Sequence, residues 1–536
     1  MAETPAPDRA LSDAAGAVDV ATELVDRACA ALRARGGVDA DQVVAYDVAH
    51  AAAAVATGRA ALEYGAHGPD EALIAAAFVG DVLADLAGRV AGREDLWGSH
   101  PGWLAPVAAF LSAQRDPTVL AALAETSAPR HLGQEFELVR QTFRRFAEDK
   151  VRPHAEHVHR TNGDIPAEVI DGLAELGGFG LSVPEEYGGF AIGGESDYLG
   201  MVVATEELSW GSLCVGGSLV TRPEILTRAL VHGGTEEQKK HWLPKLASAE
   251  ILAAVAVTEP DYGSDVAGIT TSASPVDGGW VINGVKTWST FAARADVLML
   301  LARTDPDRSL AHRGLSLFVV EKPQGDGTGF VFAQQDARRP GGLAPGRLEG
   351  RPIDTIGYRG MHSYELAFEN WFVPESSLVG GSEGLGQGFY LQMQGFENGR
   401  LQTAARALGV MQAAYEAALA YAADRVVFDS PILDYQLTRA KLGRMAVMLA
   451  ATRQSAYHVA RLMAQGEGAL EASMLKAYVC RAAEWVTREA MQIHGGMGYA
   501  EEFAVSRYFL DARVLSIFEG ADETLALKVI ARRLIG

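Results

Sequence analysis

The chain changes character at ILAAVAVTEPDYGSD, residues 251–265. Upstream of this stretch the apolar residues recur with a helical period, whereas downstream they form short runs separated by glycine, proline and aspartate. These runs predict the strands Ile251–Val257, Trp280–Ile282, Val285–Trp288, Val297–Leu301, Leu315–Val320 and Phe330–Phe332. The pair Asn283-Gly284 favours a hairpin turn between two of them. The polar stretch 334–351 is expected to be a loop.

Helical patterns lie on both sides of this β region. The upstream helices begin near Phe136 and continue to about Ser248. The downstream part, from Gly386, predicts four long helices typical of an antiparallel bundle: Leu401–Ala423, Tyr435–Gln465, Leu470–Met491 and Ala521–Leu534.

The first 130 residues form a separate helical pattern. One apolar stripe consists of Ile74, Phe78, Val82, Leu86 and Val90. We expect this stripe to need a partner surface, so that the extension docks on the rest of the protein and carries no catalytic group. The predicted fold class is therefore a multidomain α+β protein. Its segments are 1–130 (helical extension), 131–250 (helical), 251–380 (β domain) and 381–536 (helical bundle).

Composition narrows the function. The chain has 536 residues, is 48% hydrophobic and carries a formal net charge of -21, which argues against a nucleic-acid partner. Its three cysteines, Cys29, Cys214 and Cys480, are too scattered for a disulfide framework or a zinc site, so no metal is expected. The sequence shows neither a signal peptide nor an apolar run long enough for membrane insertion. These features predict a cytoplasmic protein.

Four separated motifs carry the functional information: VTEPDYGSD (257–265), NGVKTWST (283–290), QIHGGMGY (492–499) and IFEG (517–520). Taken singly they are weak, since the first also fits a plain β-turn and Trp288 also fits a core residue. In this order they resemble the acyl-CoA dehydrogenase family over about residues 133–536. The resemblance implies a helical domain, a β-barrel-like middle domain and a four-helix C-terminal bundle. FAD would lie between the last two.

The resemblance also implies which residues bind FAD. Donors around Thr258 would stabilise the negative charge of a reduced flavin. Arg425 would hold the pyrophosphate across a subunit interface, although Asp429-Ser430 replaces the family's usual Gly-Lys, and a surface arginine is the alternative. His494 is expected to be structural. The predicted cofactor contacts are Val255, Val257, Thr258, Gly263, Ser264, Trp288, Ser289, Thr290, Arg425, Phe428, Gln492, Gly495, Gly496, Ala521 and Glu523.

Glu519 is the predicted catalytic base. A carboxylate between an aromatic residue and a glycine can enter a low-dielectric pocket, where desolvation strengthens it as a base. The alternative is a charge that complements a helix dipole, a role that Asp522 and Glu523 fit better. Some branched-chain members place the base at the position of Gly399. This position has no carboxylate here and leaves room for a branched substrate, while Glu397 faces elsewhere on the helix.

The extension, together with segments 216–222, 357–361, 400–407 and 517–521, is similar to family members that oxidise (2S)-methylsuccinyl-CoA to mesaconyl-CoA, a step of the ethylmalonyl-CoA pathway. A buried substrate carboxylate needs a partner. Arg222 is the candidate, with a surface arginine as the alternative, because Trp210 stands where glutaryl-CoA dehydrogenase has an arginine. The expected substrate contacts are Ser264, Arg222, Glu397, Gly399, Arg400, Phe518 and Gly520.

The expected partners are the acyl-CoA substrate, an electron-transferring flavoprotein and further copies of the chain in a homodimer or homotetramer. Three alternatives stay open. The first is a short- or branched-chain enzyme for an isovaleryl, butyryl or glutaryl thioester. The second is an acyl-CoA oxidase that reduces oxygen directly. The third is a non-catalytic flavoprotein whose extension binds a partner.

Overall fold

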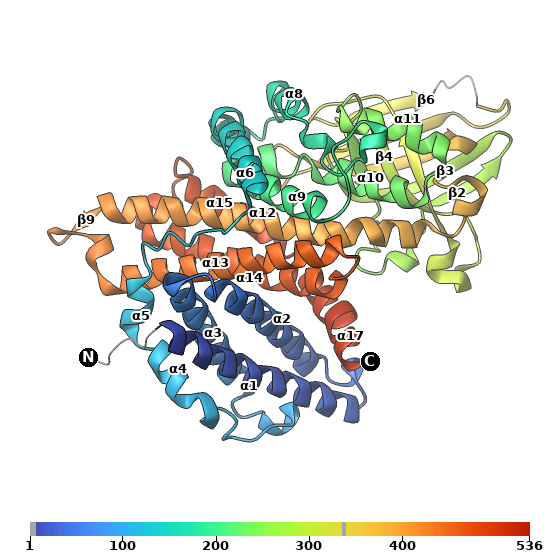
Figure 1. The fold of residues 1–536 in the computed structure, drawn as a ribbon. Coiled ribbons are helices and arrows are strands. Elements are labelled where there is room, and N and C mark those ends of the chain that lie inside the picture. The colour runs from blue at the N-terminus through green and yellow to red at the C-terminus, as the bar shows by residue number, and fades with distance from the viewer. Residues whose placement is uncertain (1–6, 335–338) are drawn as a thin grey trace. The chain divides into compact units, whose positions relative to one another are not determined.

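The computed structural model describes residues 7–334 and 339–536, drawn as a ribbon in Figure 1. These residues form two compact units. The first contains residues 7–138 and 403–536, and the second contains 139–402. Two helices, α6 (Gln134–Phe146) and α12 (Gly388–Asp424), contribute residues to both units. Among the described residues, no helix has the length and apolar character needed to cross a membrane.

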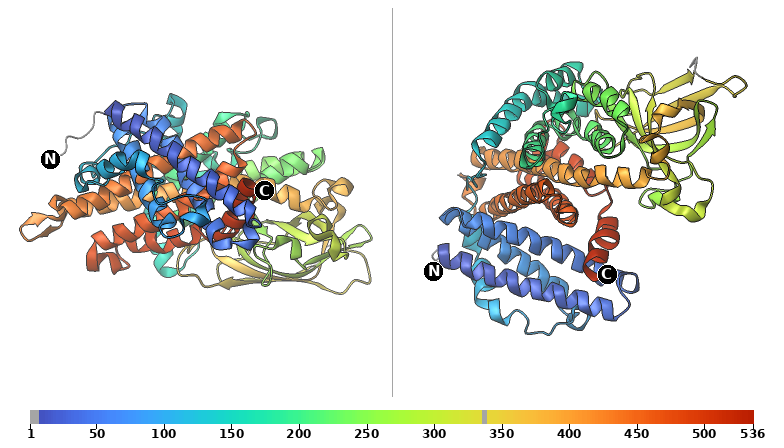
Figure 2. Two further views of the ribbon diagram at one scale, coloured as in Figure 1. Left: turned by 90° about the horizontal axis from the view of Figure 1, so that it is seen from below. Right: turned by 45° about the vertical axis from the view of Figure 1, so that its right-hand side comes forward.

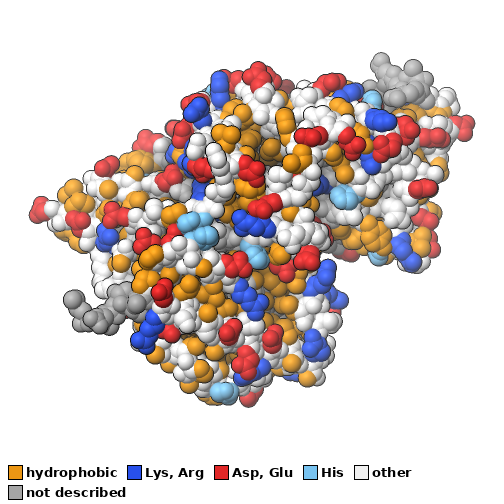
Figure 3. Space-filling view, viewed as in Figure 1, with side chains coloured by type: hydrophobic (Ala, Val, Ile, Leu, Met, Phe, Trp, Pro, Cys, Tyr) orange, Lys and Arg blue, Asp and Glu red, His pale blue; other side chains and the backbone are white. Residues whose placement is uncertain are grey.

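The N-terminal extension in the first unit is built from five helices. They are α1 (Pro7–Ala34), α2 (Gln42–Gly65), α3 (Pro69–Val90), α4 (Ala108–Gln114) and α5 (Pro117–Ala122). The stripe predicted on α3 is fully or almost fully buried, with Ile74, Phe78 and Leu86 at 0% exposure. The visible outer surface of α1 and α4 intersperses apolar side chains with charges of both signs (Figure 3).

The rest of the first unit is the C-terminal bundle, as predicted. After the end of α12 come α13 (Gln436–Ala464), α14 (Ala469–Ile493) and α15 (Ala504–Leu515), the last of which the sequence did not reveal. The final helical segment is continuous from Asp522 to Ile535 and is divided into α16 (Asp522–Thr524), η14 (Leu525–Ile530) and α17 (Ala531–Ile535).

The extension and the bundle share one apolar core. Phe78 of α3 lies in the same cluster as Val447 of α13, Met474 of α14 and Ile530 of the last segment. Helix α2 lies beside α13 and α14, α3 lies beside α13, and α1 packs on α2 and α3 (Figures 1 and 2). The expected docking of the extension is therefore confirmed. Because the extension and the bundle bury the same side chains, the extension is part of this unit's core.

Helices make up the first half of the second unit. They are α7 (Arg152–Thr161), α8 (Ala167–Glu175), α9 (Glu195–Gly211), α10 (Thr221–Gly233) and α11 (Glu236–Ala247). A capping box at Thr235 and Gln238 begins α11. Apolar residues of α10 and α11, such as Leu226, Leu230 and Leu243, pack on one face of the following sheet.

The sheet consists of eight strands in the order β1-β4-β2-β3-β8-β7-β6, with β5 paired to β4. The strands are β1 (Ala253–Ala256), β2 (Ser272–Val276), β3 (Gly279–Thr290), β4 (Val297–Arg303), β5 (Leu315–Glu321), β6 (Phe330–Gln334), β7 (Gly346–Ile353) and β8 (Ser363–Pro374). Every residue of β4 is buried. Val297 and Met299 face the helices, whereas Leu298 and Leu300 face a second core inside the curved sheet. Because β4 is buried on both faces, its residues 297–302 are apolar without interruption.

The hairpin predicted at Asn283-Gly284 was wrong. These residues lie inside the single strand β3, where a β-bulge opposite β8 separates Ile282 from Gly284. The Asn283 side chain accepts the N–H of Asn370, and a Cβ on Gly284 would lie 2.6 Å from Oγ1 of Thr271. Close backbone approach therefore explains this glycine. The actual turn is the dipeptide 277–278, which joins β2 to β3.

The predicted loop 334–351 also needs correction. Residues 346–353 form β7, which pairs with β6 on one side and with β8 on the other. The part of that prediction that falls on residues 335–338 lies outside the described residues.

Candidate active site

Glu519 lies in a tight turn between α15 and α16. Its φ angle is 54° and that of Gly520 is 97°, so two consecutive residues adopt the left-handed region. A non-glycine residue in that conformation costs roughly 1–3 kcal/mol and persists only where its surroundings fix it. The Glu519 side chain is 5% exposed. The turn therefore presents a largely desolvated carboxylate, as the sequence predicted.

Two cations that the sequence analysis did not single out fix this turn. Lys476 of α14 donates from Nζ to the carbonyl oxygens of Phe518 at 2.7 Å and of Gly520 at 2.6 Å. The guanidinium of Arg406, on α12, lies 4.6 Å from the ring centroid of Phe518, and its Nη2 lies 3.9 Å from Oε1 of Glu519. Lys476 bonds the carbonyls on both sides of Glu519, so it orients the carboxylate through the backbone.

The predicted cofactor residues of the first unit lie at helix ends and in turns. Arg425 is exposed and directly follows α12. The hairpin of β9 (Val426–Val427) and β10 (Ser430–Pro431) has Phe428 and Asp429 at its turn, both with positive φ, and Phe428 is 89% exposed.

Gln492 is exposed in the last turn of α14, followed by the exposed pair Gly495 and Gly496. Ala521 is the N-cap of α16, and Glu523 is exposed in its first turn. His494 is buried, its Nδ1 lies 2.8 Å from the carbonyl oxygen of Ala490, and its ring stacks on Tyr421. The structural role expected for His494 is therefore confirmed.

In the second unit, a buried ion pair holds the first two motifs together. Nζ of Lys286 lies 3.0 Å from Oε1 of Glu259 and donates to the carbonyl oxygen of Val257 at 2.9 Å. Burial alone would raise the pKa of the Glu259 carboxyl. The Lys286 charge and hydrogen bonds from Thr270 and Thr271 outweigh this effect and lower the pKa to about 2.

The pair fixes Thr258 beside the end of β3. The half-buried Thr258 lies between Val257 and Glu259, and its carbonyl accepts the N–H of Thr287 at 2.8 Å. The half-buried Val255 lies in β1. Backbone hydrogen bonds between Glu259 and Tyr262 close the expected turn. Thr258 is thereby brought next to the Trp288-Ser289-Thr290 segment.

This segment exposes an aromatic side chain and buries two hydroxyl groups next to it. Trp288 has a φ of 56° and is 56% exposed, which excludes the alternative of a core tryptophan. Ser289 is fully buried, and its hydroxyl has no hydrogen-bond partner among the described residues. Thr290 Oγ1 lies 3.0 Å from Oγ of Ser363. An exposed indole beside hydroxyl groups fits a flat, polar-edged cofactor such as a flavin.

Gly263 and Ser264 complete the predicted flavin set in this unit. Both are exposed, and a Cβ on Gly263 would meet only Cγ2 of Thr258, at 4.0 Å. The protein's own packing therefore does not require this glycine. The open space next to this backbone is compatible with the close approach of a ligand that the sequence predicts.

The predicted substrate residues of the second unit lie on α10 and α12. Arg222 is in the first turn of α10 and is 6% exposed, so the alternative of a surface arginine is wrong. Gly399 and Arg400 are buried on α12, whereas Glu397 is half-buried. Trp210 is flanked by Arg144 and Arg152, whose guanidinium carbons lie 3.7 and 4.1 Å from its ring centroids.

The predicted residues thus fall into two sets. The first unit holds Phe518, Glu519, Gly520, Ala521, Glu523, Arg425, Phe428, Gln492, Gly495 and Gly496, and the second holds the remainder. The structure brings together Phe518, Glu519 and Gly520 in one set, and Thr258 with residues 287–290 in the other.

Three family models match the chain in sequence order. The N-terminal domain of acyl-CoA dehydrogenase matches residues 133–250, the middle domain matches 254–371 and the C-terminal domain matches 386–535. The chain therefore belongs to the acyl-CoA dehydrogenase family, whose members are FAD-dependent oxidoreductases.

The relatives are consistent with this assignment. A (2S)-methylsuccinyl-CoA dehydrogenase of Cereibacter sphaeroides is 41% identical over 491 residues, covering 88% of this chain and 85% of the relative. Among solved structures, a glutaryl-coenzyme A dehydrogenase in complex with glutaryl-CoA has a TM-score of 0.67 and 30% identity, covering 76% of this chain and 97% of its own. A glutaryl-CoA dehydrogenase of Mycobacterium smegmatis in complex with FADH2 has a TM-score of 0.64 and 26% identity, covering 76% of this chain and 96% of its own.

Proposed function

We propose that this enzyme oxidises (2S)-methylsuccinyl-CoA to mesaconyl-CoA, with Glu519 as the base. The observation that carries the proposal is the desolvated Glu519 carboxylate in a turn that Lys476 and Arg406 fix. The Cereibacter sphaeroides relative supports the choice of substrate, because its match is too long to fit within residues 133–536. It must therefore include part of the N-terminal extension.

In the proposed reaction Glu519 removes the proton from Cα of the thioester. The electron pair of that C–H bond forms the new double bond to Cβ, and the Cβ–H bond breaks with loss of a hydride. When bound, FAD supplies the two-electron acceptor for this hydride. The backbone N–H of Glu519 would donate to the thioester oxygen, which makes the Cα proton more acidic. The fixed turn supplies orientation, since both C–H bonds must be aligned at once.

Each of the two sets contains residues that would contact FAD. Trp288 would cover the flavin ring, and the hydroxyl groups of Thr258 and Thr290 would meet its polar edge. From the other set, Gln492 and the exposed Gly495 and Gly496 would hold the nucleotide. Arg425 and Phe428 would contact the cofactor of a second copy in a homodimer or homotetramer. We propose an electron-transferring flavoprotein as the acceptor of the electrons.

Arg222 is the proposed partner of the substrate's free carboxylate. Arg222 is buried in the first turn of α10, and a guanidinium can bind a carboxylate through two parallel hydrogen bonds. Gly399 would leave room for the methyl branch. The variant Arg222→Met should lose activity on methylsuccinyl-CoA more than on butyryl-CoA. Equal loss on both thioesters would reduce Arg222 to a structural residue.

The deciding experiment is a substrate panel assayed by bleaching of the bound flavin. We expect methylsuccinyl-CoA to reduce the flavin faster than butyryl-, isovaleryl- or glutaryl-CoA. The variant Glu519→Gln should bind FAD but lose about 10²–10⁴-fold in the rate of reduction. Glu502→Gln, an exposed carboxylate before α15, is the matched control and should react normally. A preference for butyryl-CoA would overturn the substrate, and normal bleaching of Glu519→Gln would overturn the base.

Oxygen consumption separates the dehydrogenase from an oxidase. After anaerobic reduction by substrate, the flavin should reoxidise slowly in air and rapidly with electron-transferring flavoprotein. Fast reoxidation in air alone would favour the oxidase.

A further inference from the structure

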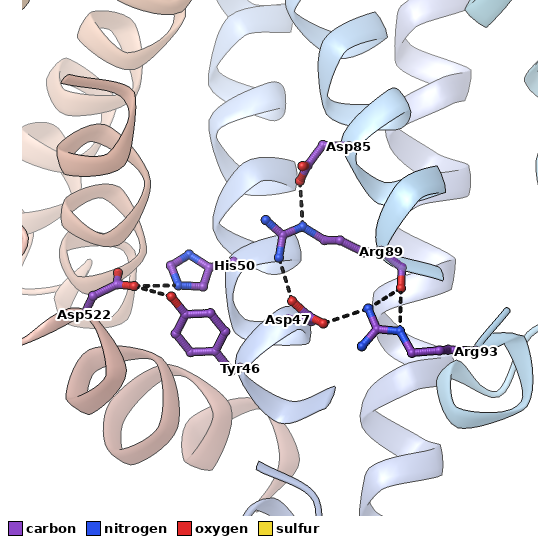
Figure 4. A network of polar contacts seen from close by, with 7 residues as sticks. All are labelled: Tyr46, Asp47, His50, Asp85, Arg89, Arg93 and Asp522. Atoms are coloured by element: carbon purple, nitrogen blue, oxygen red, sulfur yellow. Dashed lines mark hydrogen bonds and ion pairs between the residues drawn. The ribbon is translucent and has the colours of Figure 1, made fainter. Parts of the chain in front are cut away.

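Two side chains of the N-terminal extension contact the segment that carries Glu519. Tyr46 and His50 lie four residues apart on α2, so they project from the same face of the helix. The Tyr46 hydroxyl donates to Oδ2 of Asp522 at 2.5 Å, and Nε2 of His50 lies 3.2 Å from the same oxygen (Figure 4). Asp522 is the first residue of α16 and follows Glu519 by three positions.

These contacts are largely shielded from water. His50 is 4% exposed, and the Asp522 side chain is 14% exposed. Burial, together with the hydrogen bond to Asp522, raises the pKa of Tyr46 to about 12. Burial alone would raise the pKa of Asp522, but the hydrogen bonds and charge of His50 and the hydrogen bond from Tyr46 lower it. Both effects favour a carboxylate at Asp522 that accepts from a neutral tyrosine.

A second set of ion pairs fixes α2 itself. Asp47, next to Tyr46, points away from Asp522 and accepts from Arg89 at 2.7 Å and from Arg93 at 2.8 Å (Figure 4). Arg89 also bonds Asp85 at 2.6 Å, so these contacts attach α2 to the end of α3. These ion pairs stabilise the packing of α2 on α3 without contacting Asp522.

The extension holds the whole segment after Glu519. Asp39 pairs with Arg532 at 2.7 Å and with Lys528 at 3.4 Å. Arg33 donates from Nε to the carbonyl oxygen of Ile535 at 2.6 Å. Ala526, Ile530, Ala531 and Ile535 lie in the apolar core that the extension builds. Contacts from the extension thus run from the start of this helical segment to its end.

We propose that Tyr46 and His50 are positioning residues for catalysis, which fix the Glu519 turn through Asp522. The proposal rests on the proposed role of Glu519 as the base. Lys476 holds the turn on one side through the carbonyls of Phe518 and Gly520, and the extension holds it on the other through Asp522. Displacement of a reacting group by about 1 Å can slow a reaction by about 10²-fold, so the turn needs both supports.

The test compares flavin reduction in full-length holoenzymes. Tyr46→Phe removes only the hydroxyl, and His50→Leu removes the second donor. Each should lower the rate of flavin reduction by an acyl-CoA by about tenfold, the effect expected for loss of one hydrogen bond to a charged group. The Kd of the acyl-CoA should stay within about twofold, because neither residue is a proposed substrate contact. His50→Gln, whose amide nitrogen can replace Nε2, should recover most of the rate.

Asp47→Asn is the matched control. It weakens the same helix through Arg89 and Arg93 without touching Asp522, so it should lower the melting temperature and leave the rate of flavin reduction unchanged. If Asp47→Asn slowed reduction as much as Tyr46→Phe, the effect would be general destabilisation and the proposal would fail. The double variant Tyr46→Phe/Asp522→Asn should react no more slowly than Asp522→Asn. Additive losses would overturn the proposed route through Asp522.

Glu519→Gln in the same assay separates the two claims. Normal bleaching of that variant would overturn the base assignment. An unchanged rate for Tyr46→Phe beside an inactive Glu519→Gln would overturn only the positioning role.

Discussion

Replacing Lys286 by methionine should weaken both the β domain and flavin binding. Lys286 is 0% exposed, and its partner Glu259 has a side-chain exposure of 3%. The substitution leaves the carboxylate with its neutral donors: the N–H of Thr270, the hydroxyl of Thr270 and the N–H of Thr271. Removing one member of a buried ion pair costs about 3–5 kcal/mol, because the remaining charge stays desolvated. For a unit of this size, that lowers the melting temperature on the order of 10 °C.

The assay is thermal unfolding followed by the fluorescence of released FAD, together with FAD affinity at 25 °C. FAD should bind more weakly, because Val257 and Glu259 lose the ammonium group that holds them on either side of Thr258. The double variant Lys286→Met/Glu259→Gln should recover part of the melting temperature, since no charge is then left buried. The reasoning would be refuted if Lys286→Met cost less than about 1 kcal/mol, or if the double variant lost the sum of the two single effects.

Two further predictions concern buried groups of each unit. Phe78→Ala, at a position with 0% exposure, should destabilise the first unit by about 3–5 kcal/mol in urea unfolding, whereas Val43→Ala at 69% exposure should change it by less than about 0.5 kcal/mol. Burial raises the pKa of Glu224 from 4.5 to about 7 despite Arg228 nearby, so the folded wild type loses stability as pH rises from about 4.5 to about 7. Glu224→Gln does not titrate at this position. The difference in melting temperature between this variant and the wild type should therefore shift in favour of the variant as the pH rises from about 4.5 to about 7. The shift should correspond to at most about 3 kcal/mol in the free energy of unfolding. The prediction would be contradicted if the difference in melting temperature between Glu224→Gln and the wild type were the same at pH 5 and at pH 8.

The periodic elements could be predicted from the sequence, and the pairing of strands could not. The run 297–301 is apolar throughout because β4 is buried on both faces, so it was found. The strand β8 was missed, although Tyr364, Leu366 and Phe368 alternate inward along it and gave a usable signal. The hairpin turn predicted from the Asn283-Gly284 pair was wrong because a β-bulge and a hairpin turn both favour glycine. Only the pairing with the neighbouring strand distinguishes the two.

The residues of the candidate site also divide into those that a local sequence pattern reveals and those that depend on distant contacts. Glu519, Thr258 and Trp288 could be chosen as candidates because each lies in a local motif. Lys476 gave a weaker signal, a single lysine within an apolar helical stretch. Tyr46 and His50 gave none, since their partner Asp522 lies more than 470 positions away and no local pattern encodes such a contact.

The extension explains how the strained turn at Glu519 can be stable. Glu519 adopts the left-handed region, which costs energy for a residue with a Cβ, whereas Gly520 adopts it freely. Lys476 supplies two hydrogen bonds, and Tyr46 and His50 anchor the next helical residue, Asp522. The helix beyond it buries Ile530 and Ile535 against the extension. Strain at Glu519 is therefore balanced by packing contributed from the opposite end of the chain, so the extension belongs to the contacts that hold this turn in place.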